Sequence, residues 1–213
     1  MFYIDFISSM KMMYLCTSFS DNRMDAKQLI YSRETLEFAT IAKEFCAYLE
    51  TCDESQPAVF VGVCHKLLPL LYYKGTLLPH PEPLCDDLNE QFVTELQYAQ
   101  IEQKMARMLA PNDEFMLLCQ LDGRITEDVQ VASLAEHLAD VYQELKNFEG
   151  RFSIGNDEIM NDALWELSET FADRWGERLA RLVAEFHRLR HSGIDLEPPV
   201  KPHPTSDDLW DES

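Results

Sequence analysis

The chain has 213 residues, and its 38 acidic residues outnumber its 18 lysines and arginines, which gives a formal net charge of -20. This charge argues against binding to nucleic acid, because Lys and Arg must displace the counterions of a phosphate backbone, and against docking on an anionic membrane surface. The length fits one domain, and a hydrophobic fraction of 46% is enough for a core. The six cysteines include no C-x-x-C pair, so we expect a reduced, cytoplasmic protein with free core thiols.

Both ends of the chain differ from its middle. Residues 1–23 are apolar at first, but Asp5 and Lys11 interrupt the run, so neither a signal peptide nor a membrane span fits. We expect this stretch to precede the true start or to form a loosely attached extension. Residues 192–213 are rich in Pro and acidic residues and predict a disordered tail. The alternative for the tail is a docking segment, anchored by Trp210, that orders on a basic partner groove. A single helical domain is expected over residues 24–191.

The first two predicted helices follow residue 31. Over residues 32–51 apolar side chains recur on one helix face, with Ser32 as the expected N-cap. Residues 57–78 are apolar on most sides, which is typical of a helix that its neighbours bury. Pro69 removes a backbone donor in the middle of that segment, so we expect it to bend or divide the helix.

One narrow polar strip follows the second predicted helix. It contains His65, Lys66 and Tyr73, and a polar strip on a buried helix could line a ligand pocket. The alternative is that these side chains extend to solvent along the helix surface, as Lys and Tyr often do.

The middle of the chain changes from helical to strand periodicity. Thr94 and Gln97 form a capping box before a third helix, which Pro111 ends. Residues 114–131 then contain a short apolar run and an Asp-Gly pair typical of a type I′ turn, so they predict a small β-hairpin. A short helix followed by a loop is the alternative, because short apolar runs are ambiguous.

Two further helices are expected. Ser133 and Glu136 form a second capping box at the start of a helix that continues to about residue 152. A single long amphipathic helix is then predicted over residues 157–190, with acidic residues at its start and basic residues at its end, as the helix dipole favours. Its stripe consists of Met160, Leu164, Leu167, Phe171, Trp175, Leu179, Leu182, Phe186 and Leu189. Trp165 borders this stripe, and we expect either ordinary packing or an exposed binding anchor there.

Metal and catalytic signatures are weak throughout. His187 and His191 are spaced i, i+4 and share a helix face, which could seat a metal ion, but no third ligand can be identified. Their position at a helix end, where cationic groups are favourable, explains them equally well. The sequence has no Glu-x-x-His di-iron motif, phosphate-binding loop or nucleophile elbow. It therefore predicts no catalytic residues and no cofactor.

Three blocks of sequence resemble a known family. They are Lys66-Leu67-Leu68-Pro69-Leu70-Leu71-Tyr72, the run Asp140–Lys146 and the run Met160–Glu166 followed by Trp175-Gly176. Over residues 31–191 the chain is similar in these blocks to the bacterial family called domain of unknown function 5063. The resemblance implies a mostly helical, cytosolic bacterial domain, and it carries no activity or site residues that could be transferred.

We therefore expect an all-α, or nearly all-α, bundle of about five helices with a small β-hairpin. The predicted function is that of a cytoplasmic, non-enzymatic protein-interaction module, which contacts another protein through its acidic surface or its C-terminal tail. The alternative is a small-ligand binder or an unrecognised enzyme with a pocket along His65, Lys66 and Tyr73.

Overall fold

The computed structural model describes residues 26–84, 91–121 and 124–196. The expectations for residues 1–23 and for the tail around Trp210 lie outside these ranges. The helices are α2 (Ala26–Ile30), α3 (Arg33–Thr51), α4 (Pro57–Gly75), α5 (Glu95–Leu109), α6 (Leu134–Phe152), α7 (Asp157–Thr170) and α8 (Gly176–His191). The strands are β1 (Glu114–Leu121) and β2 (Arg124–Ser133).

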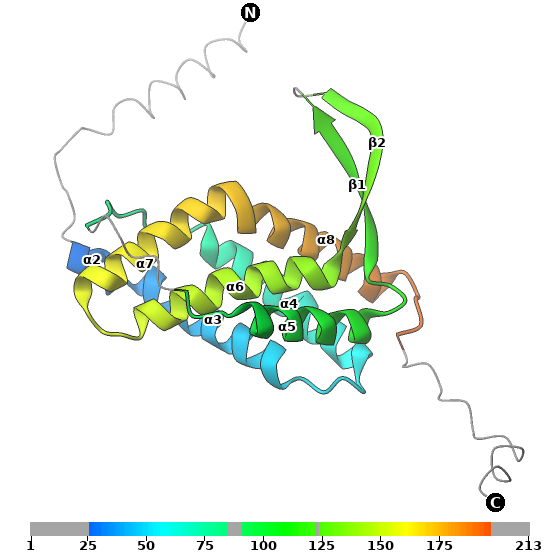
Figure 1. Ribbon diagram of the computed structural model, residues 1–213, viewed down its shortest axis with the longest axis horizontal. Helices are drawn as coiled ribbons and strands as arrows, with labels where there is room; N and C mark the ends of the chain where they lie inside the picture. Colours follow the sequence, from blue (N-terminus) through cyan, green and yellow to red (C-terminus); the bar gives the residue numbers. More distant parts are fainter. Residues whose placement is uncertain (1–25, 85–90, 122–123, 197–213) are drawn as a thin grey trace, which may run out of the picture.

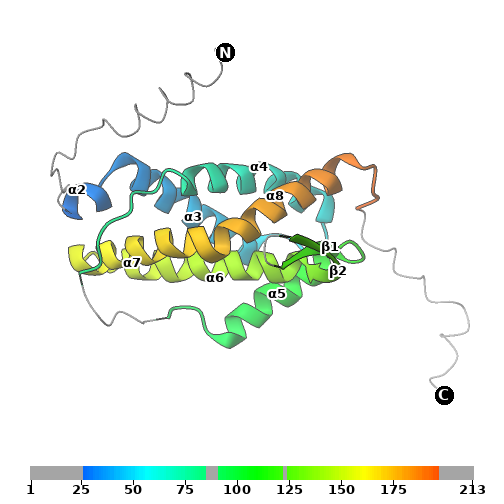
Figure 2. The ribbon, with the colours of Figure 1, turned by 90° about the horizontal axis from the view of Figure 1, so that it is seen from above.

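Four long helical segments form a bundle around one core. α3 packs against α4 and α6, α8 packs against α4 and α6, and α7 packs against α6 (Figures 1 and 2). α5 covers α6 from outside the bundle, while the short α2 contacts α7 at one end. The expected all-α fold with a small hairpin is therefore confirmed.

Helix starts lie where the capping residues predicted them. The Ser32 hydroxyl accepts a hydrogen bond from the Thr35 amide, and the Thr94–Gln97 capping box has both of its reciprocal bonds. The Ser133 hydroxyl accepts from the Glu136 amide at 3.0 Å. Because a side-chain N-cap contributes about 1 kcal/mol, these residues fix where each helix begins.

The second predicted helix is continuous but shorter than expected. α4 runs through Pro69, which does not divide it, and ends at Gly75 rather than near residue 78. Gly75 packs tightly on the last helical segment, since a Cβ there would lie 2.8 Å from the ring of Phe171 and 3.2 Å from that of Trp175. The absence of a side chain at Gly75 thus allows α4 to approach these two rings closely.

The expectation of one uninterrupted α-helix over residues 157–190 is wrong. α7 ends at Thr170, the turn Phe171–Trp175 has π-helical hydrogen bonding, and α8 follows at once. The Gly176 amide donates to the Phe171 carbonyl, five residues earlier, so the turn contains one extra residue. The segment still runs along the bundle, and its stripe is buried on both sides of the π turn.

The hairpin is present, and the alternative of a short helix with a loop is excluded. β1 and β2 pair antiparallel, with Glu114 opposite Ser133 and Met116 opposite Val131. In Figure 1 the two strands extend away from the helices, beyond the start of α6. No helix in the described ranges is long and apolar enough to cross a membrane.

Candidate functional site

Three histidines from two helices meet on the surface of the bundle. His65 lies on α4 and is half-buried, whereas His187 and His191 lie one turn apart on α8 and are exposed. α4 and α8 pack side by side. This packing brings His65, a predicted pocket residue, next to His187 and His191, the two weak candidates for metal ligands. The third imidazole that the sequence could not identify is therefore His65.

The three imidazole rings are in mutual contact. His65 Nε2 lies 3.3 Å from His187 Nδ1. The ring centroids are 5.5 Å apart for His65 and His187, 5.3 Å for His65 and His191, and 4.6 Å for His187 and His191. One ring nitrogen from each histidine lies within 4.8 Å of the other two.

The surroundings of His65 favour its neutral form. Desolvation is the main cause that lowers the pKa of His65, and the neighbouring His191 and His187 add to it, followed by Arg190 and Lys66. A neutral imidazole is the form that can offer a nitrogen lone pair to a metal ion.

The other members of the predicted polar strip lie apart from this cluster. Lys66 is exposed, and Tyr73 has 57% of its surface exposed. The Lys74 ammonium lies 5.8 Å from the centre of the Tyr73 ring, so that ring carries a cation–π contact. A pocket shared by His65, Lys66 and Tyr73 stays a prediction, and the side chains of Lys66 and Tyr73 are exposed to solvent.

The two tryptophans of the last helical segment have different surroundings. Trp165 is half-buried, which leaves it a candidate anchor. Trp175 is fully buried, and its indole Nε1 donates to the Leu167 carbonyl at 3.1 Å. The interaction candidate Trp210 lies beyond the described residues.

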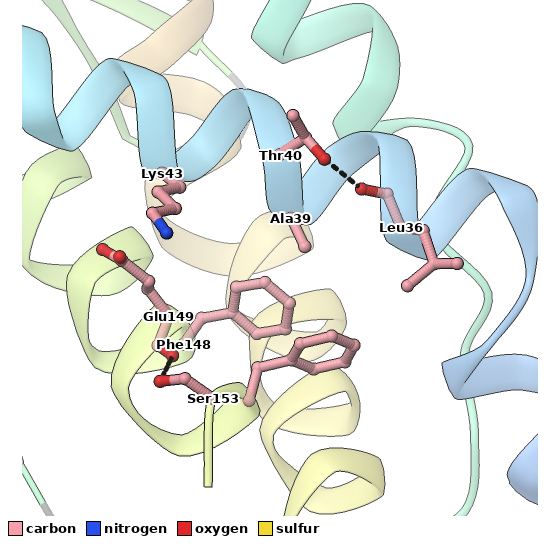
Figure 3. Close-up of a pocket in the computed structure, with 8 residues that line it drawn as sticks. Leu36, Ala39, Thr40, Lys43, Phe148, Glu149 and Ser153 are labelled. Carbon is pink, nitrogen blue, oxygen red and sulfur yellow. Dashed lines mark hydrogen bonds between the residues drawn. The ribbon is translucent and has the colours of Figure 1, made fainter. Parts of the chain in front are cut away.

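A groove that the sequence analysis missed lies between α3 and α6. Its volume is about 270 Å³, and it is shown in Figure 3. The ring of Phe148 on α6 faces Ala39 on α3, and Lys43 and Glu149 stand toward one end (Figure 3). Phe152 also lines the groove. Its residues lie on faces of α3 and α6 for which the periodicity predicts only core and core-edge positions. No local pattern in the sequence therefore indicates a groove between the two helices.

The base of the hairpin is tied to α6 by one carboxylate. Asp113 accepts from the Ser133 hydroxyl and from the Ala135 amide, both at 2.8 Å. Its backbone carbonyl accepts from the Leu134 amide at 2.8 Å. These bonds join the residue before β1 to the junction of β2 and α6, and so fix where the hairpin leaves the bundle.

The two faces of the hairpin differ sharply in burial near its base. Phe115 is buried, and its ring meets that of His137 on α6 edge-on at 5.2 Å. On the opposite face, Met116 and Val131 are cross-strand partners with 79% and 66% of their surfaces exposed. Val129, two residues before Val131 and on the same face, is 50% exposed. The outer face is thus apolar and open.

The bundle, its π-interrupted last segment and its hairpin define an all-α domain with a projecting β-arm. The chain matches the family model described as domain of unknown function DUF5063 over residues 29–192, and it belongs to that family. A crystal structure of protein BF1032 from Bacteroides fragilis is similar, with 34% sequence identity and a TM-score of 0.67. That match covers 77% of this chain and 99% of the other. No curated protein sequence matches the chain.

Proposed function

We propose that the protein is a cytoplasmic, non-enzymatic interaction module, and that the outer face of the β1–β2 hairpin is its contact surface for a second copy of the chain. The observation that carries this proposal is the pair Met116 and Val131, which lie opposite one another and are mostly exposed on a projecting arm. The described thiols of Cys46, Cys52 and Cys64 are free, in keeping with a reducing compartment.

Binding of a partner would stabilise the hairpin. A two-stranded sheet alone in water is marginally stable, and it gains stability when its apolar face is covered. Phe115 covers one face at the base by packing against the bundle. Each Å² of apolar surface buried on the other face would contribute about 25 cal/mol. Met116, Val129 and Val131 supply that surface.

A second copy suits this face because a symmetric contact places the same patch on both subunits, and an apolar patch is complementary to itself. The charge of -20 opposes close approach of two bundles. However, Met116 is the third residue of β1, and at about 3.3 Å per residue it lies about 7 Å beyond the start of the strand. That spacing on each copy is comparable to the Debye length of about 8 Å at physiological salt, so arm-to-arm contact reduces the repulsion without removing it.

The contact is expected to be weak. Two short strands offer less than the roughly 800 Å² that each partner buries in a standard interface. We therefore expect an association that appears only as concentration rises, and that increases with salt because repulsion between the acidic bundles is screened.

Sedimentation velocity over a concentration series tests the proposal. The wild-type mass should rise from 24.7 kDa toward twice that value. Met116→Lys and Val131→Lys should stay monomeric, since each places a charge in the contact. Leu96→Lys is the matched control, because Leu96 is 69% exposed in the first turn of α5, at the opposite end of that helix from the segment that leads into β1. A wild type that stays monomeric, or a Met116→Lys variant that associates like the wild type, would contradict the proposal.

Binding of a small ligand is a second candidate, supported by the groove between α3 and α6. Its apolar walls and the Lys43 and Glu149 side chains suit an apolar molecule with a polar end. A thermal-shift screen of such compounds would test it, with Ala39→Trp as the variant that fills the groove. Compounds that stabilise the wild type should fail to stabilise Ala39→Trp, and equal stabilisation of both proteins would count against the groove.

A further inference from the structure

We propose that His65, His187 and His191 form a binding site for one divalent transition-metal ion. The three imidazoles come from two helices that are packed together, and one ring nitrogen of each lies within 4.8 Å of the others. This site is separate from the hairpin and does not depend on its function.

The distances fit three nitrogen ligands around one ion. Zinc–nitrogen bonds are about 2.0–2.1 Å long, so two ligands of a tetrahedral zinc lie about 3.4 Å apart. His65 Nε2 and His187 Nδ1 are already 3.3 Å apart. The remaining separations, up to 4.8 Å, need only side-chain rotation of His191 and its neighbours, which are on the surface.

The core beneath the cluster holds the two helices in register. Phe60 on α4 and Phe186 on α8 are both buried, and their rings meet edge-on at 6.0 Å. Phe186 directly precedes His187, and Phe60 lies little more than one turn before His65. A packed aromatic contact therefore sets the rotation of both helices, and the imidazoles share the surface above it. Such support is what keeps metal ligands preorganised.

Stabilisation of the helix end does not explain the whole cluster. His187 and His191 lie in the last turns of α8, where a cationic side chain is favourable. His65 lies in the middle of α4, so that effect does not act on it.

The ligand set identifies the class of ion. Imidazole suits Zn²⁺, Cu²⁺, Ni²⁺ and Co²⁺, whereas Mg²⁺ and Ca²⁺ prefer oxygen ligands. Three protein ligands leave a fourth position of a tetrahedral ion open, and the exposure of His187 and His191 places that position toward solvent. A water molecule or a group from another molecule can occupy it.

Cobalt titration of the full-length protein tests the site, because tetrahedral Co²⁺ has intense visible absorption bands that octahedral Co²⁺ lacks. Excess Mg²⁺ is included, so that the acidic surface does not contribute. We expect one equivalent of tetrahedral Co²⁺ that one equivalent of Zn²⁺ displaces. His65→Ala, His187→Ala and His191→Ala should each weaken Co²⁺ binding at least tenfold.

Two matched controls test histidines outside the cluster. His80→Ala removes an exposed imidazole that contacts Ser168 and Glu169, and His203→Ala removes the histidine of the C-terminal segment. Both should bind like the wild type, and circular dichroism checks that every variant folds. No tetrahedral Co²⁺ in the wild type would overturn the proposal, and so would unchanged binding in His65→Ala.

Discussion

Gly176 lies against the carbonyl oxygen of Phe171, so closely that a Cβ at position 176 would come within 2.3 Å of that oxygen. The Gly176 amide donates its hydrogen bond to the same carbonyl and closes the π turn. A residue without a side chain thus permits the extra residue between α7 and α8.

Gly176→Ala should destabilise the protein by about 2 kcal/mol, because the added methyl group meets backbone that cannot move aside without opening the π turn. The free energy of unfolding in urea measures the effect. Gly62→Ala is the matched control, since a Cβ there meets nothing within 4 Å and the site is inside α4. That variant should be about 0.5–1 kcal/mol more stable than the wild type. Equal stability of the two variants would show that the π turn imposes no such constraint.

The spacing of the apolar residues around the π turn differs from that of a regular α-helix, although the sequence alone predicted one continuous helix there. Leu167, Phe171, Trp175 and Leu179 are separated by three successive steps of four residues. In an α-helix each such step advances the stripe by about 40°, so three steps rotate it by about 120°. A wider turn absorbs this rotation and keeps all four positions toward the core. Capping residues and the Asp-Gly pair act locally, and for that reason the helix starts and the hairpin could be predicted.

The buried imidazole of His137 should make stability depend on pH. Desolvation is the largest cause that lowers the pKa of His137, and Arg178 and Arg181 lower it further against the opposing effect of Asp140 and Glu136. Neither ring nitrogen has a hydrogen-bond partner among the described residues.

Because its pKa is lower in the folded state, the unfolded chain binds this proton first as pH falls. The lowered pKa of His137 therefore costs no unfolding free energy above a pH of about 6.5, its pKa in the unfolded chain. The free energy of unfolding decreases as the pH falls from there toward the folded-state pKa of His137. Urea unfolding between pH of about 7.5 and about 5.5 should show a smaller loss for His137→Gln than for the wild type. Parallel losses in the two proteins would contradict this assignment.

Asp113 should be needed to hold the hairpin on the bundle. Asp113→Ala removes the acceptor for the Ser133 hydroxyl and the Ala135 amide, and it should cost about 1–2 kcal/mol of unfolding free energy. Glu114→Ala, at the exposed neighbouring position, should change stability by less than about 0.5 kcal/mol. An Asp113→Ala variant as stable as Glu114→Ala would mean that these bonds do not secure the hairpin.

Thiol labelling should follow burial. Cys64 is fully buried, and desolvation raises its pKa well above the usual value, so the reactive thiolate is scarce. Desolvation also raises the pKa of Cys52, but this residue is only half-buried. Iodoacetamide should therefore modify Cys52 before Cys64 in the native protein, and both rapidly in urea, as followed by peptide mass spectrometry. Early modification of Cys64 would show that α4 opens locally.

The histidine cluster marks the limit of sequence-based prediction. The spacing of His187 and His191 places them on one helix face, because that relation depends only on helix geometry. His65 is 122 residues from His187, and their contact depends on how α4 packs against α8. The same holds for the hairpin, whose strands could be predicted from local pattern, while the face that stays exposed is decided by the packing of Phe115 on His137.

Amide hydrogen exchange at a low and a high protein concentration tests the role of the hairpin most directly. If the outer face of β1 and β2 binds a second copy, exchange of the hairpin amides should slow at high concentration, because the contact stabilises a sheet that is marginal alone. Amides of α5, on the outside of the bundle, should exchange equally at both concentrations. Hairpin exchange that is the same at both concentrations would contradict the proposal that this arm joins two copies of the chain.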